Sequence, residues 1–172
     1  MRSLRGKAFI REIRKSFLAV RERLDFRLLE YSFQTNHVHL IVEADDHQAL
    51  GRGMISISSR IARAAQRVYR LTGRVISSGY HARRLKTPRE VYRAIVYVLL
   101  NARKHWRQRH RSDPPRVCLD EASSARWFEG FSRALPADRS GESEVSRARS
   151  WLGRVGWRWY GRIDPGWVPG VG

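Results

Sequence analysis

Cysteine is almost absent from this sequence, and so are long hydrophobic runs. The single cysteine, Cys118, excludes an internal disulfide and disfavours a metal cluster held by thiolates. No apolar stretch approaches the roughly 20 residues that a membrane-spanning helix requires. These two absences predict a protein of a reducing compartment without a membrane partner, and we expect it in the cytoplasm, associated with the nucleoid.

Acidic residues are scarce relative to basic ones. The 172 residues include 34 Lys and Arg against 16 Asp and Glu, which gives a formal net charge of +18. Only four of the basic residues are lysines, and arginine is the better bidentate partner for phosphate. A polyanion such as a nucleic acid is therefore the first partner to consider.

The basic charge is concentrated in the first part of the chain. Residues 1–110 hold 24 basic and 8 acidic residues, a balance of +16, whereas residues 111–172 hold 10 and 8, a balance of +2. A Ser-Asp-Pro-Pro break at 112–115 separates the two parts. We predict a domain over 1–110, followed by a Trp-, Gly- and Pro-rich extension over 111–172 that is structural or contacts DNA.

The spacing of apolar residues predicts an α+β domain. Two β-prone runs, 26–33 and 37–43, flank the turn residues 34–36 and are predicted to pair as a hairpin. Residues 74–85 indicate a short strand or an ordered loop. Apolar residues three and four positions apart, together with capping signals, predict helices over 7–24, 46–72, 88–105 and 143–154. The predicted fold class is a small antiparallel sheet with flanking helices.

The tripeptide His37-Val38-His39 lies in the second predicted strand. Side chains two positions apart on a strand point to the same face, so both imidazoles are expected to project together, with Cα atoms about 7 Å apart. This spacing suits two ligands of one metal ion. A metal ion combined with a basic surface suggests chemistry on a phosphodiester.

Tyr97 and Asn101 lie one turn apart on the predicted helix 88–105 and therefore share a face. A phenolic oxygen can attack phosphorus and form a covalent ester, which stores the energy needed to rejoin the strand. A free phenol has a pKa near 10, so a cation and nearby arginines would favour the phenolate at neutral pH. Mg²⁺ and Mn²⁺ accept amide oxygens as ligands, which makes Asn101 a candidate ligand beside the two histidines.

The order of the motifs is more specific than any one of them. Asn36-His37-Val38-His39-Leu40-Ile41-Val42 is followed by Gly73-Arg74-Val75, by Tyr80-His81 and by Tyr97-Val-Leu-Leu-Asn101-Ala-Arg. In this order they resemble the single-tyrosine HUH transposases, where HUH means His, bulky hydrophobic, His, and most closely the REP-associated tyrosine transposases. The resemblance covers about residues 7–110.

The resemblance implies a fold, a reaction and a set of residues. The implied fold is a ferredoxin-like or RRM-like domain, and the reaction is cleavage and rejoining of single-stranded DNA beside a hairpin, through a 5′-phosphotyrosine and a free 3′-OH. It implies Tyr97 as the nucleophile and His37, His39 and Asn101 as ligands of Mg²⁺ or Mn²⁺. We expect a monomer or homodimer. The predicted DNA contacts are Arg74, His81, Arg83, Arg84, Lys86, Arg103 and Lys104.

Two features depart from this family. Its members usually begin with an additional strand before the first helix, whereas this sequence opens almost directly with that helix. A sheet without this strand is expected to expose apolar surface and an unpaired edge, which would weaken activity. In addition, Ser77-Ser78-Gly79 stands where relatives carry charged or aromatic residues, and this loop is expected to bind DNA poorly.

Several alternatives remain open from the sequence. Glu43 shares the face of the two histidines and could complete a zinc or iron site, although a solvated position at the strand end is favoured. His81 could contact phosphate or pack. The competing tyrosines 31, 69, 80 and 92 lack an Asn four positions later in a helix, and the histidines predicted to lie on the surface are 47, 105 and 110. For the whole protein, the alternatives to a transposase are a noncatalytic DNA-binding remnant and a binder of structured RNA.

Overall fold

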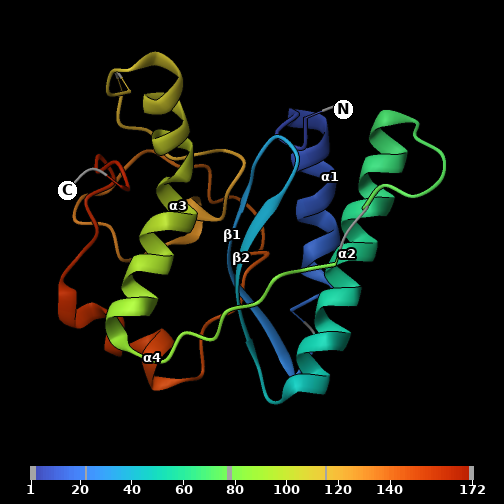
Figure 1. The fold of residues 1–172 in the computed structure, drawn as a ribbon, viewed down its shortest axis with the longest axis horizontal. Helices are drawn as coiled ribbons and strands as arrows, with labels where there is room; N and C mark the ends of the chain where they lie inside the picture. Colours follow the sequence, from blue (N-terminus) through green and yellow to red (C-terminus); the bar gives the residue numbers. More distant parts are fainter. Residues whose placement is uncertain (1–2, 22, 77–78, 115, 171–172) are drawn as a thin grey trace.

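The computed structural model describes residues 3–21, 23–76, 79–114 and 116–170. A two-stranded antiparallel sheet lies at the centre, with α3 on one side and the α1–α2 pair on the other (Figure 1). The predicted α+β class, a small antiparallel sheet with flanking helices, is confirmed. The elements in chain order are α1 (Lys7–Leu18), β1 (Phe26–Phe33), β2 (Val38–Ala44), α2 (His47–Tyr69), α3 (Pro88–His110), η1 (Ala125–Trp127), α4 (Trp151–Arg154) and η2 (Gly156–Tyr160).

The hairpin has one irregularity, which decides where its side chains point. Leu28 pairs with Val42 and Glu30 pairs with Ile41, so Leu29 is an extra residue in β1. One inserted residue reverses the alternation of a strand. As a result, Phe26 and Leu28 before the bulge and Tyr31 and Phe33 after it all pack into the same core with α1 and α2.

The core between the sheet and the α1–α2 pair is rich in aromatic residues. Phe9 and Phe17 of α1 are fully buried, as are Tyr31 and Phe33 of β1. Phe17 lies edge-on to Tyr31 with ring centroids 5.4 Å apart, and Phe9 lies edge-on to Phe33 at the same distance. Burial and ring contacts of this kind stabilise a small domain strongly.

A second core lies on the α3 side of the sheet. It combines α3 residues such as Ile95 and Leu99 with Ile41 of β2, and with Phe128 and Trp157 of the extension. The extension also supplies Ala122 to the first core. The amino-acid composition changes near position 111, but residues before and after this position pack together in both cores.

The outer edge of β1 is covered by the C-terminal extension. The N–H of Phe33 donates to the carbonyl of Ala122, the N–H of Ser124 donates to the carbonyl of Tyr31, and the N–H of Ser146 donates to the carbonyl of Leu28. Ser32 and Ser123 form an antiparallel bridge. Residues distant in sequence therefore provide hydrogen-bonding partners along the outer edge of β1, whereas β2 has β1 as its one strand partner among the described residues.

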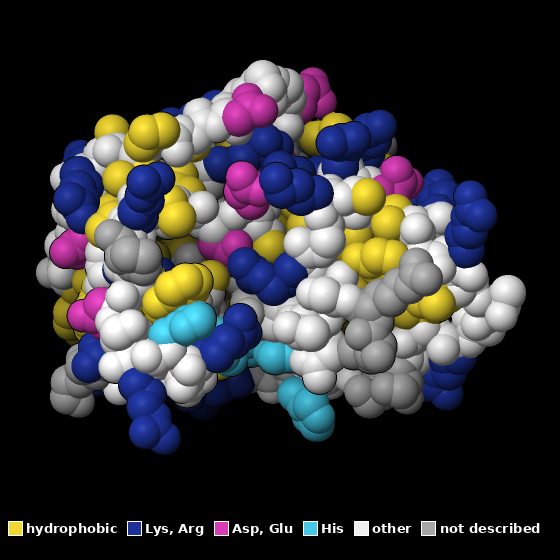
Figure 2. All heavy atoms as spheres, turned by 90° about the horizontal axis from the view of Figure 1, so that it is seen from above, with side chains coloured by type: hydrophobic (Ala, Val, Ile, Leu, Met, Phe, Trp, Pro, Cys, Tyr) yellow, Lys and Arg dark blue, Asp and Glu magenta, His cyan; other side chains and the backbone are white. Residues whose placement is uncertain are grey.

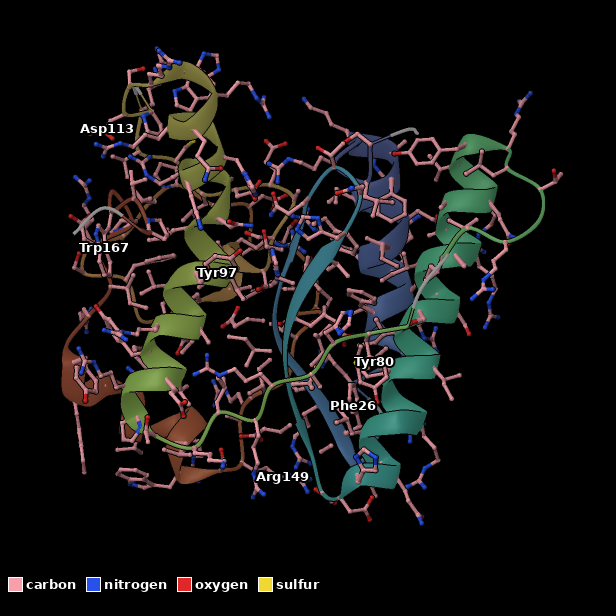
Figure 3. The ribbon with its side chains drawn as sticks, viewed as in Figure 1. Phe26, Tyr80, Tyr97, Asp113, Arg149 and Trp167 are labelled. Atoms are coloured by element: carbon pink, nitrogen blue, oxygen red, sulfur yellow. The ribbon has the colours of Figure 1, made fainter. Side chains whose placement is uncertain are left out.

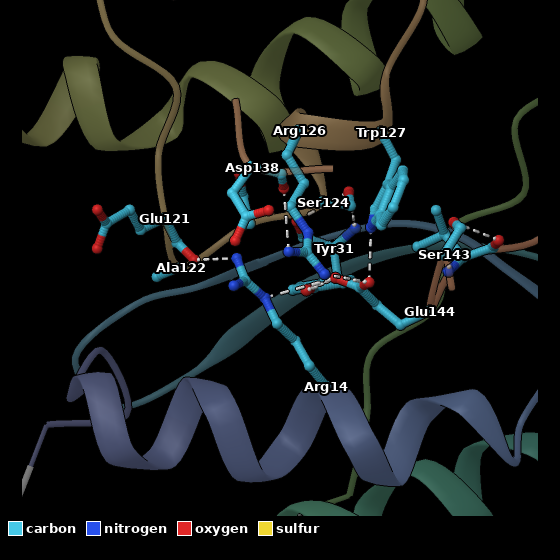
Figure 4. Close-up of polar contacts among 12 residues, drawn as sticks. Arg14, Tyr31, Glu121, Ala122, Ser124, Arg126, Trp127, Asp138, Ser143 and Glu144 are labelled. Carbon is cyan, nitrogen blue, oxygen red and sulfur yellow. Dashed lines mark hydrogen bonds and ion pairs between the residues drawn. The ribbon is translucent and has the colours of Figure 1, made fainter. Parts of the chain in front are cut away.

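A buried carboxylate connects the extension to α1 and β1 (Figure 4). Glu144, 1% exposed, accepts hydrogen bonds from the Tyr31 hydroxyl at 2.6 Å, the Trp127 indole at 2.6 Å and Arg126 at 3.0 Å. Arg14 of α1 lies 3.5 Å away. Burial alone would raise the pKa of Glu144, but the hydrogen bonds from Tyr31, Arg126 and Trp127 outweigh it and hold the pKa below its ordinary value.

Three predicted elements differ from those observed. The first helix ends at Leu18, and Leu24, predicted to belong to its apolar stripe, is 76% exposed. Residues 74–76 and 79–85 form no strand, and in the region 143–154 only Trp151–Arg154 are helical. Within the described residues, no helix is long and apolar enough to cross a membrane.

Candidate active site

The two motif histidines lie together on the α3 side of the sheet. Val38, Leu40, Val42 and Ala44 of β2 pack toward α1 and α2, so the alternation of the strand directs His39 to the opposite face. The rings of His37 and His39 have centroids 4.7 Å apart, and their Nε2 atoms are separated by 3.1 Å, within hydrogen-bonding distance. The prediction that both imidazoles share one face is confirmed.

The residue before the pair orients His37. The Nδ1 atom of His37 lies 2.9 Å from the side-chain oxygen of Asn36. An amide oxygen accepts hydrogen bonds, so this contact fits a tautomer with the ring proton on Nδ1, in which the Nε2 lone pair would be directed at the second ring. The sequence pattern predicted only a turn at Asn36 and carried no signal for this contact with His37.

Tyr97 approaches the histidines from α3. Its ring lies 5.0 Å from the ring of His39, at an interplanar angle of 75°, and its side chain is 37% exposed. The Nζ atom of Lys104, two turns further along α3, lies 5.0 Å from the centre of the same ring. A cation at this distance is attracted by the ring face. Strand and helix thus bring the predicted nucleophile into contact with one predicted ligand, His39.

Asn101 is the least conventional member of the group. It is fully buried, and neither its amide nitrogen nor its amide oxygen has a hydrogen-bond partner among the described residues. Buried polar atoms are almost always paired, so this orphaned oxygen calls for a partner that the chain itself does not supply. A cation would satisfy the oxygen, although it would leave the amide nitrogen unpaired.

His105 is a further α3 residue that bears on the two histidines, at a partly exposed position that agrees with its predicted place on the surface. It lies eight residues after Tyr97, and therefore on nearly the same face of α3. Its side chain is half-buried, with Nδ1 3.2 Å from the side-chain oxygen of Gln108. Charge on His105 acts on both motif histidines. The spacing from Tyr97 was the available signal for this residue.

Both motif histidines are held in their neutral form. Burial is the main factor that lowers the pKa of His37, followed by His105. Burial lowers the pKa of His39 to about 4, with further contributions from His37, His105 and Lys104. Neutral imidazole is the form that coordinates metals, so the pair is ready to bind a cation across the neutral pH range.

The observed geometry fits a small divalent ion. Ligand atoms about 2.1 Å from an octahedral ion lie about 3.0 Å apart at adjacent positions, and the two Nε2 atoms are separated by 3.1 Å. The described residues contain no cluster of three or more His, Cys, Asp and Glu that could hold a metal. A metal here would therefore depend on the two histidines, on an amide such as that of Asn101, and on water or phosphate oxygens.

Glu43 is engaged elsewhere. Its carboxylate accepts hydrogen bonds from the backbone N–H of Arg149 at 2.7 Å and from the N–H and hydroxyl of Ser150, and Arg27 pairs with it at 3.3 Å. The favoured solvated position was wrong, because Glu43 is half-buried and anchors the extension to the end of β2. These contacts also count against a metal site built on Glu43.

The predicted DNA contacts lie on two elements: five on the connection between α2 and α3, and two, Arg103 and Lys104, on α3 itself. Arg74, His81, Arg83, Arg84 and Lys86 are exposed on the connection that leads from α2 to the start of α3, where Arg83 pairs with Glu90 at 2.7 Å. Figure 3 shows Tyr80 on this connection and Tyr97 on α3. Figure 2 shows histidines gathered on one face beside Lys and Arg side chains. Ser77 and Ser78, expected to weaken DNA binding, lie outside the described residues.

Arg103 differs from the other predicted contacts. It is 9% exposed, and its guanidinium donates to the carbonyls of Gly166 at 3.1 Å and Arg116 at 3.0 Å. These bonds attach the extension to α3. Because its donors are used within the protein, Arg103 has no place in the DNA-binding set considered below.

No family model, curated protein or solved structure matches this chain.

Proposed function

We propose that this protein cleaves and rejoins single-stranded DNA beside a hairpin, with Tyr97 as the nucleophile. The phenolic oxygen attacks a backbone phosphorus and displaces the 3′ oxygen of the preceding nucleotide, which takes up a proton and leaves as a free 3′-OH. The 5′-phosphate remains attached to Tyr97. Attack by a 3′-OH on this ester reverses the step and restores both the phosphodiester and the phenol.

Each member of the site has a distinct part in this proposal. His37 and His39 would hold Mg²⁺ or Mn²⁺, with Asn101 as the candidate third protein ligand. When bound, the cation would supply charge that polarises the scissile phosphate. Lys104, whose ammonium lies 5.0 Å from the centre of the Tyr97 ring, would attract the backbone phosphate to the nucleophile. The half-exposed position of Tyr97 leaves it accessible to a DNA backbone.

One observation carries the proposal: the contact between the Tyr97 and His39 rings at 5.0 Å. The two residues are 58 positions apart and lie on different elements. Packing of α3 on the sheet needs apolar side chains, and it does not by itself require a tyrosine to contact a histidine pair. The orphaned Asn101 oxygen one turn further along α3 supports the same interpretation.

The test uses labelled hairpin DNA with a single-stranded flank, incubated with the protein and Mn²⁺. We expect a denaturation-resistant protein–DNA adduct that chelation with EDTA prevents and Tyr97→Phe abolishes. Tyr80→Phe is the matched control, because Tyr80 is similarly exposed at 43% and also lies among basic residues. It should form the adduct normally.

Two results would contradict the proposal. Binding of the hairpin without any adduct would indicate a noncatalytic DNA-binding protein. Preferential binding of RNA hairpins, unaffected by EDTA, would indicate recognition of structured RNA instead.

A further inference from the structure

Two exposed tryptophans lie side by side on the C-terminal extension. Trp151 opens α4 and Trp159 lies in η2, and their rings meet edge to face with centroids 4.9 Å apart. Their exposed fractions are 49% and 71%. Indole rings are large apolar groups that are usually covered, so an adjacent pair of exposed rings marks a surface suited to contact with flat apolar groups.

The position of Trp151 is fixed within the protein. A methyl group added at Gly156 would lie 2.7 Å from a carbon of the Trp151 ring, so the ring packs directly against the backbone there. The preceding residue, Ser150, caps α4 by accepting from the N–H of Gly153 at 3.1 Å, and Glu43 fixes Ser150 to the end of β2. A ring held in this way loses little freedom when it binds a ligand.

The segment that carries the pair is rich in arginine. The segment between Glu144 and Asp164 contains five arginines and no acidic residue. Arg154 and Arg158 are exposed beside the two tryptophans in sequence, and the Arg158 guanidinium lies 4.7 Å from the centre of the buried Trp157 ring. A polyanion that also carries flat apolar rings complements both features of this surface.

We propose that Trp151 and Trp159 stack on unpaired bases of single-stranded DNA while Arg154 and Arg158 contact its phosphates. The choice of DNA rests on the function proposed above. Stacking requires bases that are not already paired and stacked in a duplex, and it is tolerant of sequence because every base has a ring face. An apolar protein partner fits this surface less well, since it would bury arginine charges without pairing them.

The pair formed by Trp151 and Trp159, here called the stacking platform, is connected to α3, the helix that carries Tyr97. Figure 1 places α4 beside the N-terminal part of α3. Tyr160, next to Trp159, packs on Tyr92 of α3 with ring centroids 5.6 Å apart. Tyr92 precedes Tyr97 by five residues, about 7.5 Å along the helix axis. Bases bound at the platform would therefore be held on the same α3 scaffold as the cleavage site.

The test compares two ligands of equal length and charge: an oligothymidylate and an abasic oligomer with the same phosphodiester backbone. Binding is measured by fluorescence anisotropy at fixed salt. Trp159→Ala should weaken oligothymidylate binding about tenfold and leave abasic binding unchanged within twofold. Trp159→Phe retains a ring and should lose at most about threefold. Trp167→Ala is the matched control, because Trp167 is 42% exposed on the same extension outside the pair.

Three outcomes would overturn the proposal. The first is equal affinity of the wild-type protein for oligothymidylate and the abasic oligomer. The second is an equal loss of affinity for both ligands in Trp159→Ala. The third is a tenfold higher affinity for RNA than for DNA that Trp159→Ala removes. Circular dichroism checks that the variant is folded, and Trp159→Phe provides the test if it is not.

The Tyr97 adduct assay, run on Trp159→Ala at saturating DNA, separates this inference from the proposed function. If Trp159→Ala forms the adduct and binds oligothymidylate as tightly as the wild type, only the stacking platform is refuted. Weakened base binding in Trp159→Ala, with no adduct in any protein, would refute only the cleavage reaction.

Discussion

The two faces of the same hairpin differ in chemistry. Toward α1 and α2, the sheet presents Phe26, Tyr31 and Phe33 to a tightly packed aromatic core. Toward α3, the same strands present His39, and Glu30 and Glu43 lie half-buried at this side with polar partners. Polar groups at such positions cost stability unless they are paired. The face toward α1 and α2 maintains the fold, and the face toward α3 carries the residues of the proposed site; each prediction below tests that division.

The largest expected effect concerns the α3 face and activity alone. His39→Ala should reduce adduct formation at least about 100-fold, because loss of a metal ligand removes several kcal/mol of transition-state stabilisation. Its free energy of unfolding should change by less than about 1 kcal/mol. His47→Ala, at an exposed position on α2, is the control. An active His39→Ala protein would show that the histidine pair has no part in the chemistry.

The converse experiment concerns the aromatic face. Phe33→Ala removes a fully buried ring that contacts Phe9, Phe17 and Tyr31, and it should lower the free energy of unfolding by about 3–5 kcal/mol in denaturant titration. Leu24→Ala, at a position 76% exposed, should change it by less than about 0.5 kcal/mol. A small effect of Phe33→Ala would mean that this core is not the main source of stability.

The buried Glu144 joins the extension to both faces. Glu144→Gln weakens the hydrogen bonds from Arg126 and Trp127 and the ion pair with Arg14, and we expect a loss of about 2 kcal/mol in the free energy of unfolding. Glu142→Gln, two residues away and exposed, should be neutral. If both variants are equally stable, the extension is held by its apolar contacts alone.

The last prediction is a dependence of stability on pH. Burial raises the pKa of Glu30 to about 8, the nearby Glu144 adds to the rise, and a hydrogen bond from Ser124 opposes it. A carboxyl whose pKa is higher in the folded state than in the unfolded state contributes full stability below about pH 4.5 and loses it as pH rises toward 8. Glu30→Gln should therefore be close to the wild type in stability near pH 5, and its stability should exceed that of the wild type by a growing margin as pH rises toward 8.5. Parallel pH profiles of the two proteins would contradict this assignment.

Much of the fold follows from local sequence signals. The turn residues 34–36 and the alternation of β2 predict the hairpin, and Thr87 with Glu90 predicts the start of α3 through a capping box that the structure contains. The periodicity of residues 7–24 overestimated the first helix. Its apolar spacing continues past Leu18, but Val20 is buried outside the helix and Leu24 is exposed.

The bulge and the covered edge could not be predicted in this way. Nothing in the composition of β1 distinguishes Leu29 as the extra residue. The position of the bulge depends on which side chains of β1 pack against α1 on one face of the sheet and against α3 on the other. Pairing of Ala122, Ser124 and Ser146 with β1 joins residues about 90 to 120 positions apart, and such contacts leave no short-range pattern.

Within the candidate site, pairs of residues on the same strand or the same helix could be predicted from the repeat of that element. His37 and His39 follow the strand repeat, and Tyr97 with Asn101 follows the helix repeat, so each pair is visible separately. Their meeting depends on the packing of α3 over the sheet. Arg103 was misjudged because its burial depends on the extension, whose path from 111 onward has few sequence signals.

The most direct test of the central claim is to identify the amino acid that carries DNA. The protein is incubated with hairpin DNA and Mn²⁺, digested with protease and nuclease, and analysed by mass spectrometry. We predict a single modified peptide, with a nucleotide 5′-phosphate on the Tyr97 oxygen. A nucleotide attached to any other residue, or an unmodified Tyr97 in protein that has cleaved the DNA, would contradict the account.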